Sequence, residues 1–196
     1  MRQASSSRVM ARIIRGAVLT LAGVSAVLAQ SNRYVVKDNP GASPPYTSWA
    51  QAAATIQDAV GVCASGDVVW VRAGVYDAGW VTNWPLGSTL KTRVAVTTAY
   101  VTVRSEFNDP ASTIIQGRFD SGEPGAPGTI TNGPNAVRCV YLADKTRLIG
   151  FTITNGATLT SGDISGAGIN ALSTSPVVSN CLIVGNAAYT AGNGYS

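Results

Sequence analysis

The feature that most limits the fold of this chain is a series of short β-prone segments with no helix between them. From Gly66 onward, Gly, Asn, Asp or Pro bounds each segment, which is typical of strands joined by turns. The predicted strands are residues 68–71, 94–96, 101–103, 113–115, 148–154 and 177–184. Such a series forms either an antiparallel sandwich or barrel, or a solenoid in which each strand stacks on its counterpart in the next coil.

Internal repetition favours the solenoid. Residues 147–156 align with residues 177–186 at an offset of 30, and the Gly-Ala-Gly-Ile of 166–169 returns as Gly-Asn-Gly-Tyr at 192–195, 26 residues later. These offsets predict coils of roughly 25 to 30 residues, a period at which repeat architectures form. The extra residues at 157–165 are expected to bulge out as a loop.

The 30-residue alignment also predicts where each coil bends. It places Gly150 opposite Asn180, and both residue types accept the left-handed backbone conformation at low cost. The inward-facing pairs that it predicts are Phe151 on Cys181 and Ile153 on Ile183. The asparagines that we interpret as turn residues, with side chains bonded to nearby backbone, are Asn155, Asn170, Asn180 and Asn186.

One helix is predicted, over residues 49–63, because apolar residues recur there at intervals of three or four. Ser48 and Gln51 have the spacing of a capping box at its start. Gly61 and Gly66 weaken and then end the pattern.

Two blocks of sequence resemble parts of a known group of proteins. The first block comprises residues 34–36, 49–60 and 66–76, and the second comprises residues 150–156, 166–169 and 175–183. They resemble the N-terminal module and the coils of the pectin-lyase-like right-handed parallel β-helix proteins of exported bacterial type, and the second block is also similar to polymorphic outer-membrane passengers. The resemblance implies an all-β fold, a right-handed parallel β-helix solenoid whose N-terminal capping helix covers the open edge of the first coil.

Residues 1–29 are predicted to be an export signal peptide. An uncharged apolar run over 16–28, too short to span a bilayer comfortably, follows Arg2, Arg8, Arg12 and Arg15. Val27 and Ala29 supply the small residues that a signal peptidase reads, so we expect cleavage before Gln30. The alternative is an uncleaved anchor. With the signal removed, we expect a secreted or cell-surface protein with no transmembrane span.

Residues 30–196 are expected to hold the N-terminal cap and the first coils of a longer β-helix domain, because the chain stops just after opening another coil. The whole chain has 14 Lys and Arg against 10 Asp and Glu. Four of the arginines fall in the signal, which leaves ten charges of each sign. The remaining domain is therefore close to neutral, and no nucleic-acid partner is expected.

The chain contains no histidine, which excludes Ser-His-Asp, Cys-His and His-metal chemistry. Its cysteines are odd in number and widely spaced, an arrangement that argues against a disulfide framework. Each is expected to be a small buried apolar side chain: Cys63, Cys139 and Cys181.

Enzymes of the resembled fold work with carboxylates and cations on one outer face, often with calcium bridging an acidic sugar. The chain offers the carboxylates of Glu106, Asp109, Asp120, Glu123, Asp144 and Asp163, and the cations of Arg104, Arg118, Arg138, Lys145 and Arg147. No pair of them has a matching motif context. Residues 106–110 with 120–123 could hold a calcium ion through oxygen ligands, against the simpler interpretation that they are solvated loop charges. No other cofactor or metal is expected.

Tyr76, Trp80 and Trp84 lie in a loop-like stretch where exposed rings would form a platform for sugar rings. The alternative is that these rings pack over the cap and the first coils.

Two functions therefore stand open at the level of sequence. The first is a non-catalytic surface or secreted scaffold, adhesin-like or polysaccharide-binding, whose partner is a polysaccharide or a cell-surface glycan. The second is a polysaccharide lyase or glycoside hydrolase of the pectin-lyase-like fold with its active residues beyond Ser196. We favour the first, because no active-site motif is present in the chain.

Overall fold

The computed structural model of this chain describes residues 30–121 and 126–189, and these residues form a strand-rich fold with one short helix. The helix α1 spans Ile56–Gly61. The strands are β1 (Asn32–Val35), β2 (Val68–Val71), β3 (Gly74–Tyr76), β4 (Lys91–Val96), β5 (Thr102–Ser105), β6 (Thr113–Gln116), β7 (Val137–Leu142), β8 (Arg147–Ile149), β9 (Thr152–Thr154), β10 (Ile169–Ala171), β11 (Val177–Ser179) and β12 (Leu182–Val184).

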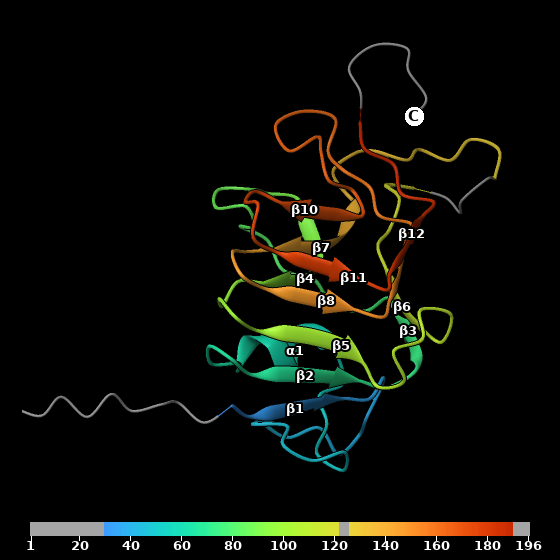
Figure 1. Cartoon of the computed structure of the whole chain (residues 1–196). Helices are drawn as coiled ribbons and strands as arrows, with labels where there is room; N and C mark the ends of the chain where they lie inside the picture. Colours follow the sequence, from blue (N-terminus) through green and yellow to red (C-terminus); the bar gives the residue numbers. More distant parts are fainter. Residues whose placement is uncertain (1–29, 122–125, 190–196) are drawn as a thin grey trace, which may run out of the picture.

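The strands form three parallel sheets, to which successive turns of the chain contribute one strand each. Sheet A has the order β1-β2-β5-β8-β11, sheet B the order β12-β9-β6-β3 and sheet C the order β10-β7-β4. Figure 1 shows the strands of sheet A one above the other, running from blue to red along the chain. This is the arrangement of a solenoid. The structure therefore confirms a strand-rich fold of stacked coils with parallel sheets.

The 30-residue alignment is the register of the last two coils. Arg147 pairs with Val177, and Ile153 pairs with Ile183 as predicted. Ile153 is fully buried, but Ile183, on the last described coil, is 53% exposed. The earlier coils are longer than the predicted 25 to 30 residues, because Val68 pairs with Thr102 and Thr102 with Arg147, spacings of 34 and 45 residues. The second predicted register falls partly on residues 192–195, which lie outside the described residues.

The coils that begin at β2, β5 and β8 each have their longest connection at the same corner of the solenoid. The longest connections join sheet B to sheet C, and they span residues 77–90, 117–136 and 155–168. The predicted loop at 157–165 is part of the third. We call this edge of the molecule the B–C corner.

The bend between sheets A and B recurs as the sequence predicts. Gly150 has φ 82° and Asn180 has φ 47°, both in the left-handed region. A Cβ added at Gly150 would also clash with the side chain of Ser105 on the preceding coil. This bend therefore requires a residue that tolerates positive φ, and at position 150 it requires glycine.

The core is a set of side chains that stack from coil to coil. Val69, Val103 and Leu148 occupy successive positions of sheet A, and each is fully buried. Phe151 is also fully buried, and Cys181 packs against the same core from the next coil. Full burial of an aliphatic side chain contributes about 1.5–3 kcal/mol, so these columns are a main source of stability.

The helix is much shorter than the predicted 49–63. The structural N-cap is Thr55, whose side chain accepts a hydrogen bond from a backbone N–H in the first turn. Ser48 does accept from the N–H of Gln51 at 3.3 Å, but this bond closes a turn and starts no helix. Three residues of the helix, Ile56, Ala59 and Val60, are buried in the core.

The backbone of Ala53 explains the shorter helix. Its N–H donates to the carbonyl of Tyr34, and its own carbonyl accepts from Val36. Residue 53 thus pairs with the first strand in a parallel bridge, a geometry that a helical residue cannot adopt. The apolar spacing over 49–53 reflects burial against β1, not helical periodicity.

Asp67 fixes the first strand to the coil that follows. Its carboxylate accepts from the backbone N–H groups of Ser31 and Ala64 and pairs with Arg33 at 3.0 Å. Burial acts to raise the pKa of Asp67, but these hydrogen bonds and the guanidinium lower it below its ordinary value. The charged carboxylate is therefore the form that the fold stabilises.

The six-residue α1 is the one helix in the described part of the chain, and no helix there is long and apolar enough to cross a membrane.

Candidate functional site

The predicted aromatic residues do not share one surface. Tyr76 is 4% exposed and donates its hydroxyl to the carbonyl of Arg72 at 2.8 Å, so its ring belongs to the core. Trp84 is half-buried and packs on Tyr141, with ring centroids 5.7 Å apart. Trp80 alone of the three is well exposed, at 52%. The predicted three-ring platform is therefore reduced to Trp80.

Trp80 lines a pocket at the B–C corner with a volume of about 240 Å³. We call it the Trp80 pocket. The first and second corner loops and the starts of β4 and β7 supply the walls. Its lining residues are Asp77, Gly79, Trp80, Lys91, Arg93, Arg118, Asn135 and Val137.

Strand geometry brings the cations of this pocket together. Lys91 and Arg93 lie two residues apart on β4, and side chains at that spacing share one side of a strand. Arg118 exchanges two backbone hydrogen bonds with Val137, of 3.1 and 2.8 Å, which holds it beside the start of β7. A Cβ at the preceding Gly117 would clash with the carbonyl of Val137, so glycine permits this close approach.

The cations Lys91 and Arg93 contact different kinds of group. Lys91 places its Nζ 5.3 Å from the centroid of the Trp80 ring. Arg93 is 6% exposed, and it donates through Nε to the carbonyl of Gln116 at 2.8 Å and through Nη1 to the carbonyl of Gly79. Burial is the main reason that the pKa of Arg93 lies below its ordinary value. The nearby carboxylate of Asp77 acts to raise this pKa, and the charge of Arg118 lowers it.

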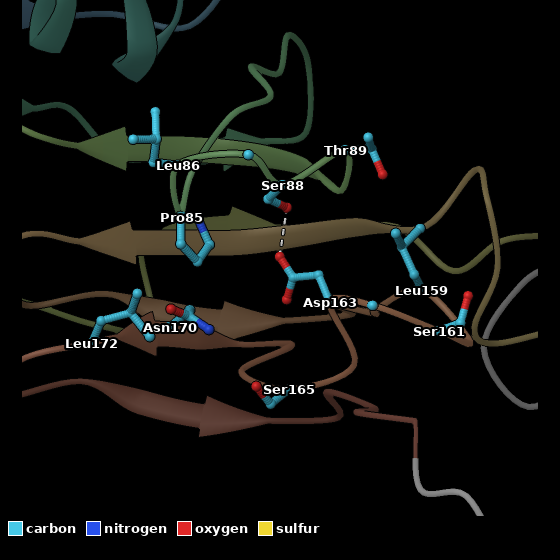
Figure 2. Close-up of a pocket in the computed structure, with 12 residues that line it drawn as sticks. Pro85, Leu86, Ser88, Thr89, Leu159, Ser161, Asp163, Ser165, Asn170 and Leu172 are labelled. Atoms are coloured by element: carbon cyan, nitrogen blue, oxygen red, sulfur yellow. Dashed lines mark hydrogen bonds between the residues drawn. The ribbon is translucent and has the colours of Figure 1, made fainter.

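A second and larger pocket, of about 390 Å³, lies between the first and third corner loops and β10. Figure 2 shows Asp163 near its centre, bonded to Ser88. We call it the Asp163 pocket. Its walls combine hydroxyl groups with the apolar side chains of Leu86, Leu159 and Leu172.

The charge of Asp163 is balanced from beneath by Arg138. This guanidinium is fully buried, pairs with Asp163 and donates to the carbonyls of Trp84, Ser165 and Gly166. Ser88 donates to the other carboxylate oxygen at 2.6 Å. Both oxygens of Asp163 are thus engaged, and the network ties the first corner loop to the third.

The remaining predicted cations lie away from both pockets. Arg104 stacks over Trp70, with its guanidinium carbon 4.4 Å from the ring centroid. Lys145 lies 5.1 Å from the ring of Tyr100, and Arg147 is exposed. Sequence reasoning named Arg118 but missed Lys91 and Arg93, for which the alternation of Lys-Thr-Arg before an apolar run is the only signal.

The predicted carboxylates are mostly engaged with nearby groups. Glu106 pairs with Arg72 at 3.1 Å. Backbone N–H groups donate to Asp109 and Asp120, at 3.0 and 2.6 Å, and Ser175 donates to Asp144 at 2.9 Å. Across residues 30–121 and 126–189, no three acidic, cysteine or histidine side chains gather as a metal site would need. Glu123 lies outside these ranges.

The three cysteines are free, and Cys139 is buried. Burial raises the pKa of the Cys139 thiol to about 12 and that of Cys63 to about 11. Both are therefore protonated near neutral pH, and neither has the thiolate character of a nucleophile.

The asparagines have mixed roles. Asn155 lies in the left-handed region like Asn180, and Asn186 donates to the carbonyl of Ile153 at 2.9 Å, as expected of turn residues. Asn170 differs, because it lies within β10 with a buried Oδ1 that has no hydrogen-bond partner.

No known protein family, curated protein or solved structure matches this chain. The Trp80 pocket and the Asp163 pocket are therefore interpreted from their own chemistry.

Proposed function

We propose that this chain is an exported, right-handed parallel β-helix of the pectin-lyase-like type that binds polysaccharide without modifying it. In this proposal the signal peptide is removed before Gln30, α1 caps the first coil, and the protein is secreted or displayed at the cell surface. The coils act as a scaffold that presents the loops of the B–C corner. Trp80 is the residue that contacts the glycan.

The observation that carries the proposal is the exposed Trp80 ring at the rim of a polar pocket. Apolar ring faces favour contact with sugar rings, while the surrounding polar groups bond to hydroxyls. The pocket volume of about 240 Å³ suits one sugar unit or a substituent of it, so a longer glycan would lie across the corner.

The carboxylates favour binding over hydrolysis. A glycosidase needs two carboxyl groups held on either side of the scissile bond. The Trp80 pocket has one carboxylate in its lining, Asp77, and the Asp163 pocket has one, Asp163. The latter bonds to Arg138 and Ser88 through its two carboxylate oxygens, so both oxygens are already engaged within the protein.

The test is affinity electrophoresis of the protein through gels that contain soluble neutral or acidic polysaccharides, with and without calcium. Binding is measured as retention of the protein in the gel. We expect Trp80→Ala to weaken retention at least about tenfold, a loss typical of an aromatic contact residue. The matched control is Tyr100→Ala, because Tyr100 is a similarly exposed ring beside a lysine but lies outside the pocket. Equal retention of both variants, or no retention of any polysaccharide, would contradict the proposal.

A parallel measurement addresses catalysis. The same polysaccharides are incubated with the protein, and new reducing ends and unsaturated products are assayed. We expect neither product. Turnover that disappears in Asp163→Asn or Asp77→Asn would contradict the proposal and would place an active residue within this chain, not beyond Ser196.

A further inference from the structure

The Trp80 pocket carries more positive charge than its own residues neutralise. Three cations line it, Lys91, Arg93 and Arg118, against the single carboxylate of Asp77. That carboxylate also lies 3.7 Å from Lys37, outside the pocket. The lining therefore has a formal charge of +2.

Arg93 is the most informative of the three cations, because it is 6% exposed. Its guanidinium donates to two backbone carbonyls. No carboxylate of the described residues lies within ion-pair distance of it, and Asp77 acts on it only from farther away. Burying a charge without an ion-pair partner is costly. A site that accepts this cost has its charge compensated when an anion binds.

Arg118 and Lys91 are placed to complete an anion site. Arg118 is exposed and forms no ion pair with any residue in the described ranges, while its backbone is fixed by the two hydrogen bonds to Val137. Lys91 holds its ammonium group beside the Trp80 ring. Guanidinium groups bind phosphate oxygens in pairs, and an ammonium group adds a point charge.

The magnitude of the charge selects among anions. A carboxylate or a sulfate ester supplies one negative charge and leaves the pocket positive. A phosphomonoester carries about −1.5 to −2 at pH 7, with three acceptor oxygens, and so matches the lining. The Asp163 pocket shows the contrast, since its buried arginine already has a carboxylate partner.

We propose that the Trp80 pocket binds the phosphomonoester group of a phosphorylated sugar, with Arg93 and Arg118 on the phosphate and the sugar ring against Trp80. The sugar part rests on the proposed function, whereas the phosphate part stands on the pocket alone.

The experiment is calorimetric titration of the full chain with inorganic phosphate, glucose 6-phosphate, glucuronate and glucose. We expect glucose 6-phosphate to bind at least about tenfold more tightly than glucuronate, and glucose to bind least. The affinity for glucose 6-phosphate should rise between pH 5 and pH 7.5, because the phosphate loses its second proton near pH 6. Equal affinities for the phosphate and the carboxylate, or no rise with pH, would overturn the inference.

Variants locate the binding site. Arg118→Gln should weaken phosphate binding at least about tenfold, the loss expected for a hydrogen bond between charged groups. Arg147→Gln, an exposed arginine on β8 outside the pocket, is the matched control and should bind as the parent does. Circular dichroism spectra of both variants establish that they are folded. Identical behaviour of the two variants would place the phosphate elsewhere.

The outcomes separate the inference from the function on which it partly rests. Retention of polysaccharide without preference for phosphate defeats the inference and leaves the proposed function standing. Binding of inorganic phosphate without retention of any glycan defeats the proposed function and leaves the anion site.

Discussion

Arg138 and Arg93 lie on neighbouring strands of one sheet and are both buried, but their hydrogen-bond and ion-pair partners differ. Arg138 has a carboxylate partner, Asp163, and three carbonyl acceptors. Arg93 has two carbonyl acceptors and no carboxylate partner in the described residues. A buried arginine is structural where a carboxylate of the chain pairs with it, and it is available to a ligand where no carboxylate does.

The largest effect on stability is expected when the carboxylate partner of Arg138 is removed. Asp163→Ala leaves a fully buried guanidinium unpaired, and we expect the free energy of unfolding to fall by about 3–5 kcal/mol. Urea denaturation measures it. The control is Asp144→Ala, which removes an exposed carboxylate bonded to Ser175 and should have a much smaller effect on stability. Equal losses would mean that Asp163 has no special structural role.

The second expected effect is a gain in stability when phosphate supplies Arg93 with an anion. At a phosphate concentration of about 100 times the dissociation constant, a ligand that binds only the folded state stabilises it by about 2.7 kcal/mol. We expect this increase in the parent protein and an increase of only about 1.4 kcal/mol or less in Arg118→Gln, whose affinity is at least about tenfold weaker. Thermal denaturation in phosphate and in chloride buffers of equal ionic strength measures both. The same increase in both proteins would refute the pocket as the site.

Another arginine–carboxylate pair, Arg33 with Asp67, makes the stability depend on pH. The pKa of Asp67 is lower in the folded protein than in the unfolded chain, so its contribution is complete above the unfolded value near 3.9 and is lost as the pH falls through the folded value. Asp67→Asn should lower the free energy of unfolding by about 1–3 kcal/mol at pH 7. The difference between the two proteins should shrink in acid. A difference that stays constant from pH 7 to pH 2 would contradict this assignment.

The smallest expected effect on stability belongs to the exposed ring of the pocket. Trp80→Ala should change the free energy of unfolding by less than about 0.5 kcal/mol, as is usual for exposed positions, while it weakens glycan binding. Tyr100→Ala should change neither quantity. A large loss of stability in Trp80→Ala would show that the ring has a structural role.

The sequence predicted the last coils well because their signals are local. The 30-residue repeat contains its own register, and Gly150 and Asn180 mark the bend by residue type alone. The strand β7 was missed although all six of its residues are buried. It contains Arg138, whose burial depends on Asp163, 25 residues away, and no local pattern reveals that partner.

The candidate site was predicted in part. Trp80 and Arg118 are recognisable as an aromatic and a cation in turn-rich stretches, and both line the pocket. Tyr76 was misplaced because it ends a short strand and turns its side chain to the core. Lys91 and Arg93 were missed because only the pairing of β4 with β7 brings them beside Arg118, and such pairing is not visible in a local pattern.

At the B–C corner, the length of the loops can change without a change in the stacked strands. Strand pairs keep their register although the second loop between sheets B and C is six residues longer than the first and the third. Insertions and deletions at 77–90, 117–136 or 155–168 can therefore accumulate without shifting a single pair of stacked strands. Both pockets are built from these loops, so new ligand specificities can evolve at this corner while the solenoid beneath it is inherited unchanged.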